Sequence, residues 1–589
     1  MNLWITKISQ TRFSKTDRSN FSQIISDKFS HKFEVFEHKT PDIHFLSFSK
    51  NQTKYKKYIH SRNEQEVFSY SGIIIDTKES VIDYRNAEVL ANNNVDTNDL
   101  TNHLCGQFAL VSIKNNEFRC VVDNLGLYKV FYYSDAQKNI YISNHLSFIQ
   151  GVKKSKRNFD FLINFIANGG TFGHETMEKD VLTLPESGEL RWSPGSGLTI
   201  KRYQEFSELF TPPPGDPIET TGRQLQQIAT YLTKYHDVLI PLSGGYDSRT
   251  ILNMFWGRYS NNLTAYSYLD HPYDFKTAKK LARKYGVNHI EIMPGEIPSV
   301  NELHQFSLER YPFVCYSSVF KYVFYETSQK KLYNTEKVEL WGNGGAIDMG
   351  VAGFGDMDNL SPKKSIEKLA SKKVNRTILT QDAYKHFHTR VTDYYSEKYS
   401  PLFDQVKNFN LPTAHYMFER FASYQGHKYS DSYSDGSKVH YFPYGNKYFV
   451  QLTLSSDTKE LMRRKKGGLH HQLTDFLTDK KSPRVPYAKS LHWNATKSDK
   501  AAYYLKRDYV DRLFKKLNLT KDKYSNQVRN SFFDKNEEHF IDVVHSYSNS
   551  KLWDFIDYNH VKNSLENPKN RKMNMKLLFR IIPLLKEGL

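Results

Sequence analysis

The stretch VLIPLSGGYDSRTIL, from Val238 to Leu252, joins an apolar run to a helix-forming run through a serine and two glycines. Glycines permit positive φ and let the backbone approach a ligand closely. The amides at the start of the following helix, near Asp247, lack intrahelical partners, and the helix dipole attracts anions to them. The junction therefore predicts a phosphate or pyrophosphate site. Asp247 opposes a bare phosphate, so we expect it to hold Mg²⁺ there, because hard cations prefer carboxylate oxygens.

Around this junction, runs typical of strands alternate with runs typical of helices. Strands are expected at Asp237–Leu242, Leu263–Leu269 and Asn288–Met293, with helices at Thr220–Lys234, Ser248–Gly257 and Asp274–Gly286. Such alternation predicts a parallel sheet with crossover helices. Lys337–Gly345 (KVELWGNGG) is a further expected strand that runs into a glycine-rich turn, and from about Thr377 the pattern is mostly helical.

The first two hundred residues read instead as strands paired in hairpins. Gly106–Asn124 and Leu127–Asn144 each contain two β-rich runs around a polar turn, which predicts an antiparallel sheet. Phe159–Gly170 is expected to form a short helix ending in glycine. The prolines of TPPPGDP (Thr211–Pro217) favour a linker there. The chain is thus expected to be an α/β protein with domains at residues 1–210 and 211–589.

Composition limits the other classes of function. The chain has 589 residues and a formal net charge of +18, and such a charge attracts nucleic acid, anionic membrane surfaces or acidic ligands. No RNA-binding signature accompanies the charge, so we expect a solvated basic surface and no nucleic-acid partner. No apolar stretch of about 18 residues occurs, and the N-terminus is too polar for a secretory signal, so no membrane partner is expected. Three cysteines without a CxxC spacing fit a reducing cytoplasm, and a homodimer is left open.

The motif SGGYDS (Ser243–Ser248) resembles the SGGxDS pyrophosphate loop of the N-type ATP pyrophosphatases, and the alternative is an ordinary strand–turn–helix junction. The GxxxxGK[ST] pattern of a Walker A loop is absent. Over nearly its whole length, the chain resembles the asparagine synthetase B family. The segments that carry this resemblance are Tyr266–Ile292, Val338–Gly350, Tyr441–Leu473, Arg119–Tyr133 and Arg202–Phe206.

The resemblance implies a fold, cofactors and site residues. Residues 1–210 would form an Ntn-hydrolase-like antiparallel β-sheet and helix domain, of the class II glutamine amidotransferase type. Residues 211–589 would form a parallel-sheet ATP pyrophosphatase domain (adenine nucleotide α-hydrolase-like) with a helical C-terminal part. Lys466 and Asp247 would be catalytic, and Asp247 with Asp348 would bind Mg²⁺. ATP would lie on Leu242, Ser243, Gly244, Gly245, Asp247, Ser248, Ser267, Tyr268 and Gly342.

Two of these assignments keep an alternative. Asp348 is equally well interpreted as an ordinary loop aspartate. Lys465 takes the place of Lys466 if the register shifts by one residue, and a solvated basic loop is the alternative for the whole run.

The chain also departs from the family pattern. Glutamine-hydrolysing members have a cysteine directly after the initiator methionine, where this chain has Asn2, so no glutaminase activity is expected. In this respect it is similar to β-lactam synthetase and the lasso-peptide cyclases. Asn343 replaces the catalytic glutamate, and a neutral amide is no general base near pH 7. The other departures are Ala346 and Asn446 in place of aspartates and His470 in place of an arginine. We interpret His470 and His471 as surface histidines.

The first functional hypothesis is an ATP-dependent, AMP-forming ligase that joins a small-molecule or peptide carboxylate to an amine through an acyl-adenylate. Such a ligase would serve the biosynthesis of a specialised peptide, natural product or surface sugar. The second hypothesis is a degenerate homologue that binds a nucleotide or a partner without catalysis. The third is adenylation of the kind seen with tRNA substrates.

Overall fold

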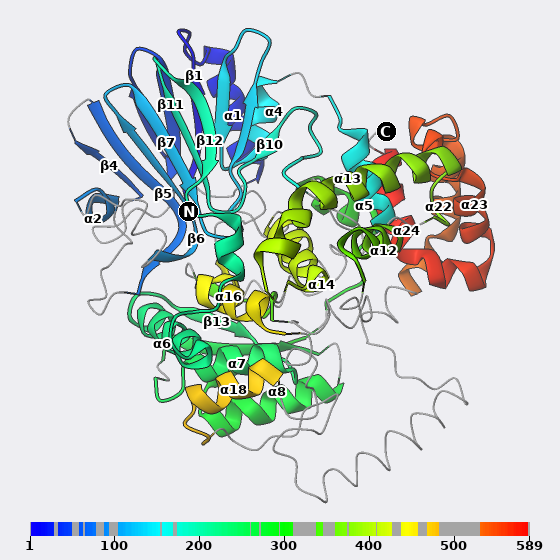
Figure 1. Cartoon of the computed structure of the whole chain (residues 1–589). Coiled ribbons are helices and arrows are strands. Elements are labelled where there is room, and N and C mark those ends of the chain that lie inside the picture. The colour runs from blue at the N-terminus through cyan, green and yellow to red at the C-terminus, as the bar shows by residue number, and fades with distance from the viewer. Residues whose placement is uncertain are drawn as a thin grey trace, which may run out of the picture.

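Figure 1 shows the computed structural model of the chain. The structure describes residues 2–28, 33–49, 58–62, 65–77, 87–92, 104–153, 156–168, 173–258, 261–269, 272–293, 295–309, 337–345, 360–373, 376–407, 409–426, 438–457, 468–481 and 531–586. The protein is of mixed α/β type, with two antiparallel sheets, one parallel sheet and many helices.

Two six-stranded antiparallel sheets form the N-terminal part (Figure 1, upper left). Side chains of both sheets meet in one core, where Trp4 and Phe45 of the first sheet join Val111 and Phe118 of the second. The first sheet has the order β10 (Leu182–Thr183), β8 (Phe131–Ser134), β9 (Ile140–Ser143), β1 (Asn2–Ile8), β3 (Ile43–Ser49) and β2 (Glu34–Lys39). The second has the order β12 (Gly197–Arg202), β11 (Gly188–Ser193), β7 (Glu117–Val122), β6 (Leu104–Lys114), β5 (Glu66–Asp76) and β4 (Ile59–Arg62).

Both predicted hairpins are confirmed, but they belong to different sheets. β6 and β7 pair around Asn115 and Asn116, whose positive φ values of 50° and 62° suit a tight hairpin turn. β8 and β9 pair in the first sheet. Between them, the buried Asp123 carboxylate accepts hydrogen bonds from the backbone of Leu127 (3.0 Å) and Tyr128 (2.8 Å), which fixes the turn from one sheet to the other. The single sheet that the hairpins suggested is therefore a pair of sheets.

Helices cover the outer face of the first sheet. α1 (Lys15–Lys28) and α4 (Leu146–Val152) bury Phe21 and Phe148 in one cluster with Leu3 and Ile5 of β1.

α5 (Phe159–Asn168) confirms the expected helix, and its Ile166 carbonyl accepts a hydrogen bond of 2.8 Å from Arg580. α2 (Ala87–Asn92) is a short helix beside β4 and β5.

The predicted parallel sheet is confirmed, with five strands. Its order is β15 (Asn288–Ile292), β14 (Leu263–Tyr268), β13 (Val238–Pro241), β16 (Lys337–Leu340) and β17 (Lys438–Tyr441). The last strand lies in a region predicted to be mainly helical. Four residues are too few to show the two-residue period of a strand, and only the pairing with β16 defines β17.

Each face of the parallel sheet has its own hydrophobic core. On one face pack α6 (Pro217–Tyr235), α7 (Tyr246–Met254), α8 (Pro272–Tyr285) and α18 (Gly468–Leu477), seen at the bottom of Figure 1. The core of the other face includes α9 (Val300–Glu309), α12 (Pro362–Lys373), α13 (Gln381–Gln405), α14 (Leu411–His415), the π-helix Tyr416–Gln425, α22 (Glu537–Ser546), α23 (Tyr558–Glu566) and α24 (Pro568–Lys586). α16 (Lys447–Ser455) contributes to both cores.

The boundaries of α5, α6, α7 and α8 differ from the prediction by up to three residues. α6 begins at Pro217, three residues early, because proline is tolerated in a first turn and the Asp216 side chain accepts a hydrogen bond of 2.8 Å from Glu219 N. The linker expected at Thr211–Pro217 therefore ends at Asp216. α7 runs from Tyr246 to Met254 and so begins and ends earlier than the expected Ser248–Gly257.

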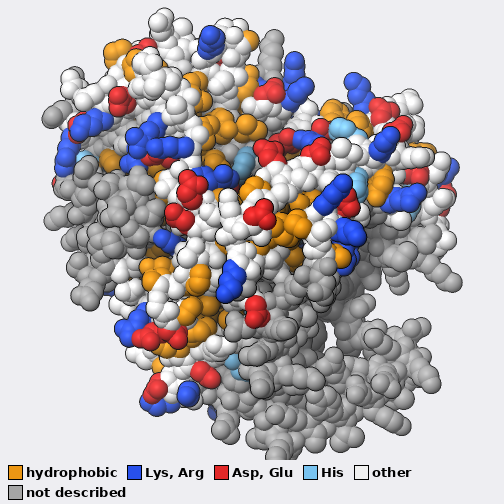
Figure 2. All heavy atoms as spheres, viewed as in Figure 1, with side chains coloured by type: hydrophobic (Ala, Val, Ile, Leu, Met, Phe, Trp, Pro, Cys, Tyr) orange, Lys and Arg blue, Asp and Glu red, His pale blue; other side chains and the backbone are white. Residues whose placement is uncertain are grey.

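On the face that Figure 2 shows, lysine and arginine side chains are scattered among acidic and apolar ones. Among the described helices, none combines the length and the apolar character that a membrane crossing requires. Cys105 and Cys120 are free and buried, and burial raises the pKa of both thiols.

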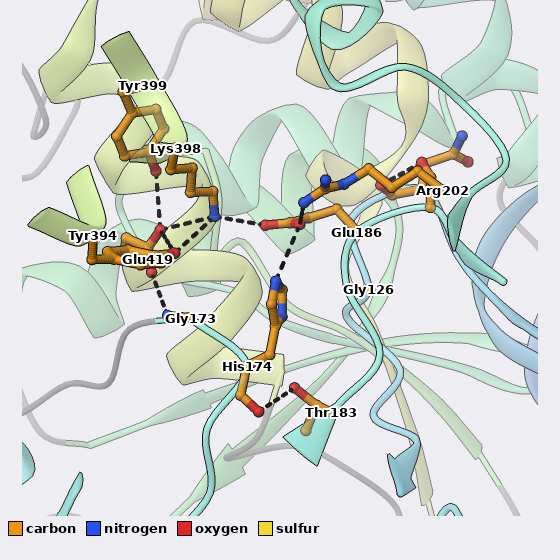
Figure 3. A network of polar contacts seen from close by, with 12 residues as sticks. Gly126, Gly173, His174, Thr183, Glu186, Arg202, Tyr394, Lys398, Tyr399 and Glu419 are labelled. Atoms are coloured by element: carbon orange, nitrogen blue, oxygen red, sulfur yellow. Dashed lines mark hydrogen bonds and ion pairs between the residues drawn. The ribbon is translucent and has the colours of Figure 1, made fainter. Parts of the chain in front are cut away.

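A buried network of charges joins the N-terminal sheets to the helices (Figure 3). The Lys398 ammonium donates to Glu186 (2.8 Å) and Glu419 (3.0 Å). Arg202 donates to Glu186 at 3.1 Å. Burial opposes ionisation of Glu186, but the surrounding cationic groups, with Lys398 the strongest among them, together outweigh it and hold the pKa of Glu186 well below its ordinary value. Burial lowers the pKa of His174 to about 4, so its 3.9 Å approach to Glu186 is no ion pair at neutral pH.

We expect Lys398→Met to lower the free energy of unfolding by about 3 kcal/mol, because it leaves two buried carboxylates without their shared cation. Urea unfolding at pH 7 measures the loss. Lys279→Met is the matched control, since it breaks an exposed pair with Glu291 and should change stability by less than about 0.5 kcal/mol. Equal effects of the two substitutions would contradict this account of the network.

Lys129, buried beside this network, gives stability a pH dependence. Burial lowers its pKa to about 8 from an ordinary 10.5, although the negative charges of Asp123 and Glu186 raise it. Between these two pH values the unfolded chain holds a proton that the folded chain lacks, so stability rises with pH. We therefore expect the difference in unfolding free energy between the wild type and Lys129→Met to move in favour of the wild type as pH rises from 8 to 10. A flat or opposite trend in urea unfolding refutes this.

Candidate functional site

The turn after β13 lies where the sheet order reverses. β13 has β14 on one side and β16 on the other, and in open parallel sheets ligands bind in the crevice outside such a reversal point. The Ser243 amide donates to the Ser248 hydroxyl at 3.0 Å, and the Gly245 amide donates to the Ser243 hydroxyl at 3.1 Å. These bonds fold Ser243–Ser248 into a compact loop at the first turn of α7. We call this segment the SGGYDS loop.

Asp247 places its carboxylate beside a histidine. Its side chain is 39% exposed, and Oδ1 lies 3.3 Å from Nε2 of His470 on α18. The same His470 nitrogen lies 2.6 Å from the Gly345 carbonyl, and Nδ1 lies 3.3 Å from the Thr250 hydroxyl. His470 and the adjacent His471 have side-chain exposures of only 14% and 9%, so their interpretation as surface histidines is wrong. The error arose because α18 packs on α6 and α7, which lie more than two hundred positions earlier in the chain.

Gly342, at the end of β16, makes close contact with the loop. A Cβ atom at this position would stand 3.1 Å from Cβ of Asp247 and 3.5 Å from the Ser248 amide nitrogen. Only glycine lets the end of β16 approach the SGGYDS loop this closely. The structure therefore brings Gly342 together with Ser243, Gly244, Gly245, Asp247 and Ser248, as the sequence suggested.

Leu242, Ser267 and Tyr268 lie at the ends of β13 and β14. The Ser267 hydroxyl donates to the Leu242 carbonyl at 2.6 Å and lies 3.0 Å from Nε2 of His289. Tyr268, at the end of β14, is half-buried and packs edge-on against Tyr266 with 5.5 Å between ring centroids. The Ser267 hydroxyl thus joins two strands beside the candidate nucleotide site.

The altered family positions have different surroundings. Asn343 is half-buried in the turn after Gly342. Asn446 is 2% exposed, accepts a hydrogen bond of 2.9 Å from the Tyr441 hydroxyl and donates to the Pro443 carbonyl at 2.6 Å. Asn446 therefore serves the structure of its own turn. Ala346, Asp348, Lys465 and Lys466 lie outside the described residues.

The sequence interpretation missed a buried polar cluster near the end of β16. Glu339 is fully buried, and its carboxylate accepts hydrogen bonds from Trp341 Nε1 (2.9 Å) and from the Tyr266 hydroxyl, and lies 3.0 Å from Nδ1 of His440. A glutamate between Val338 and Leu340 in β16 was the one signal that could have pointed to it. Glu339 lies three residues before Gly342 in the chain.

The chemistry that these groups allow is anion binding next to a carboxylate. The start of α7 supplies amides and a favourable dipole, and Asp247 supplies the oxygen ligand that Mg²⁺ prefers. Within the described part of the chain, no group of three or more His, Cys, Asp or Glu residues could hold a metal ion by itself. Among the described residues, Asp247 would thus need further oxygen ligands, such as those of the nucleotide, to hold Mg²⁺.

Asn2, the second residue of the chain, has a structural role. Asn2 is fully buried, and its amide nitrogen donates to Ser69 Oγ and to the Tyr70 carbonyl, each at 2.9 Å. Its amide oxygen accepts hydrogen bonds from Ser47 (2.5 Å) and Ser49 (2.9 Å). With four bonds, both ends of the amide are satisfied, and Asn2 joins the two antiparallel sheets.

Comparisons with known proteins give little further information. No protein-family model matches the chain, and no curated protein matches it. Among solved structures, an allosteric regulatory enzyme of purine biosynthesis is 9% identical, covering 49% of this chain and 79% of its own, with a TM-score of 0.24. Glutamine phosphoribosylpyrophosphate amidotransferase from B. subtilis, complexed with ADP and GMP, is 10% identical, covering 59% and 77%, also with a TM-score of 0.24. Likenesses at this level carry no argument about activity.

We expect the chain to release no glutamate from glutamine, because Asn2 offers an amide where hydrolysis needs a nucleophile. Glutamate formation, followed with a coupled dehydrogenase and compared with a protein-free blank, measures this. A rate above the blank that disappears in Asn2→Ala would contradict it.

Proposed function

We propose that the chain is an ATP-dependent ligase that forms amide bonds and releases AMP and pyrophosphate. In this proposal, residues 1–210 form an Ntn-hydrolase-like domain without glutaminase activity, and residues 211–589 form an ATP pyrophosphatase domain. The observation that carries it is the SGGYDS loop, which lies at the reversal point of a parallel sheet and is folded by its own hydroxyl–amide bonds. ATP and Mg²⁺ are the expected cosubstrate and cofactor.

The loop would take part in this reaction through its amides and its carboxylate. The backbone amides at the start of α7 would bind the β- and γ-phosphates. The hydroxyls of Ser243 and Ser248 fold the loop before this helix, because they accept from the Gly245 and Ser243 amides. Asp247 would hold Mg²⁺, which neutralises phosphate charge when bound. Gly342 lets the turn after β16 lie directly against Asp247, because no side chain separates them.

The reaction would proceed in two balanced steps. A carboxylate oxygen of the acid attacks the α-phosphorus of ATP, and pyrophosphate leaves with the electrons of the broken P–O bond. The amine then attacks the acyl carbon of the adenylate, AMP leaves, and the amine loses a proton. Loss of that proton cannot involve Asn343, since an amide is no base at neutral pH.

A catalytically degenerate homologue is the second candidate, and Asn343 favours it. The amide at this position is neutral, where the family that the chain resembles has a catalytic glutamate. In this second case, the SGGYDS loop would bind a nucleotide without turnover.

The deciding experiment supplies Mg-ATP with a panel of carboxylates (aspartate, short acidic peptides and uronic acids) together with ammonia or simple amines. We expect one acid to give AMP and pyrophosphate in equal amounts. Asp247→Asn should lower that rate by about 100-fold, since it removes a charge that helps to organise the phosphates. Asp479→Asn is the control, because this carboxylate is 82% exposed.

Nucleotide binding without turnover on any acid would favour the degenerate homologue. Absence of Mg-ATP binding would refute both candidates. Pyrophosphate release stimulated by RNA would favour adenylation of a tRNA-type substrate instead.

A further inference from the structure

We propose that Gln107, in the N-terminal part of the chain, is a positioning residue for the SGGYDS loop. It acts through the segment Phe442–Asn446, which follows β17 and lies between the two. In this view, the domain that lacks the glutaminase nucleophile forms part of the support of the candidate nucleotide site.

The first link is a double hydrogen bond from one side chain to one backbone residue. Gln107 on β6 accepts from the Phe442 amide at 2.8 Å and donates to the Phe442 carbonyl at 2.9 Å. Both residues are buried, with 5% and 3% exposure. A primary amide is well suited to this task, because it offers a donor and an acceptor side by side. The pair thus holds Phe442 as a neighbouring strand would.

The second link passes through Tyr444, two residues further on. Tyr444 is fully buried, and its hydroxyl donates to the Asp247 carbonyl at 2.6 Å. Its ring lies 4.4 Å from the Phe449 ring and 5.5 Å from the His470 ring, between centroids. The ring also fills the space beside Gly345, where a Cβ atom would come within 2.5 Å of it. Tyr444 therefore contacts both loops of the candidate site.

The segment between the two links has little room to move. A Cβ atom at Gly445 would overlap the Leu127 side chain of the N-terminal part and come within 3.2 Å of the Gln107 amide nitrogen. Asn446 closes the turn with its bond to the Pro443 carbonyl. Because the segment is short, buried and hydrogen-bonded at both ends, a displacement of Phe442 must be passed on to Tyr444.

The consequence concerns the orientation of α7. The Asp247 carbonyl belongs to the first turn of this helix, and the Tyr444 hydroxyl is an additional donor to it. The amides that would bind phosphate are in the same turn. Loss of Gln107 should therefore loosen the SGGYDS loop although Gln107 lies outside it.

Amide hydrogen exchange of the unliganded protein tests this without any nucleotide. In Gln107→Ala, we expect peptides that cover residues 243–251 to exchange about fivefold to tenfold faster than in the wild type, the effect of losing a buried hydrogen-bond pair. Gln451→Ala is the matched control. Its side chain also donates across the chain, to the Glu208 carbonyl at 3.0 Å, but forms no hydrogen bond with Phe442 or Tyr444. This control should leave exchange at residues 243–251 unchanged.

Two conservative variants guard against a general loss of structure. Gln107→Met removes both hydrogen bonds to Phe442 and keeps the length of the side chain without adding a charge, and Tyr444→Phe removes only the hydroxyl that reaches Asp247. Both should speed exchange at residues 243–251 while β1 and β3 keep wild-type exchange. If both variants fold and exchange there is unchanged, the proposal is wrong.

Mg-ATP affinity is a second readout, and it rests on the proposed function. We expect Gln107→Ala to weaken binding by about fivefold to tenfold and Gln451→Ala to leave it unchanged. If the wild type binds no Mg-ATP, the proposed function fails, but hydrogen exchange still decides the role of Gln107. If affinity and exchange are both unaffected by Gln107→Ala, the proposal is overturned.

Discussion

The candidate site depends on one constraint, the position of β13 at the centre of a parallel sheet. β14 follows it on one side and β16 lies on its other side, so the chain leaves the carboxyl end of β13 where no crossover covers the edge. The SGGYDS loop fills this place because its glycines and hydroxyls can turn the chain directly into α7. The Gly342 turn, the Asp247–His470 contact and the Tyr444 bond are all arranged around that exit.

The local elements could be predicted from the sequence, because a short pattern of residues indicates each of them. β13 is an apolar run of four residues, β14 and β15 are short runs that contain β-favouring Tyr or Ile residues, and α6 has the apolar face of an amphipathic helix. Glycines at a strand–helix junction were likewise sufficient to single out Ser243–Ser248. The wrong predictions concern residues whose structure depends on contacts with residues distant in sequence. β17 exists only through its pairing with β16, and the burial of His470 follows from how α18 packs on α6 and α7.

Buried polar contacts join the two N-terminal sheets to each other and to the helices. Asn2 uses its whole amide to join the two antiparallel sheets, and Glu186 joins the same part of the chain to Lys398 on α13. Buried polar groups cost free energy unless they are fully bonded, and these are bonded at nearly every atom. Such contacts specify one relative arrangement of sheets and helices. The Gln107–Phe442 pair extends that arrangement to the candidate nucleotide site.

The contact between His470 and Asp247 is compatible with a cation at Asp247 when the imidazole is neutral. The 2.6 Å separation between Nε2 and the Gly345 carbonyl requires a proton on Nε2, because a carbonyl oxygen can only accept. Nδ1 can then accept from the Thr250 hydroxyl at 3.3 Å, so one neutral tautomer satisfies both ring nitrogens. A neutral ring does not repel Mg²⁺, whereas an arginine at this position would place a permanent positive charge about 3 Å from the same oxygen. In this neutral tautomer, the histidine holds the Gly345 loop against α7 and does not repel a Mg²⁺ ion at Asp247.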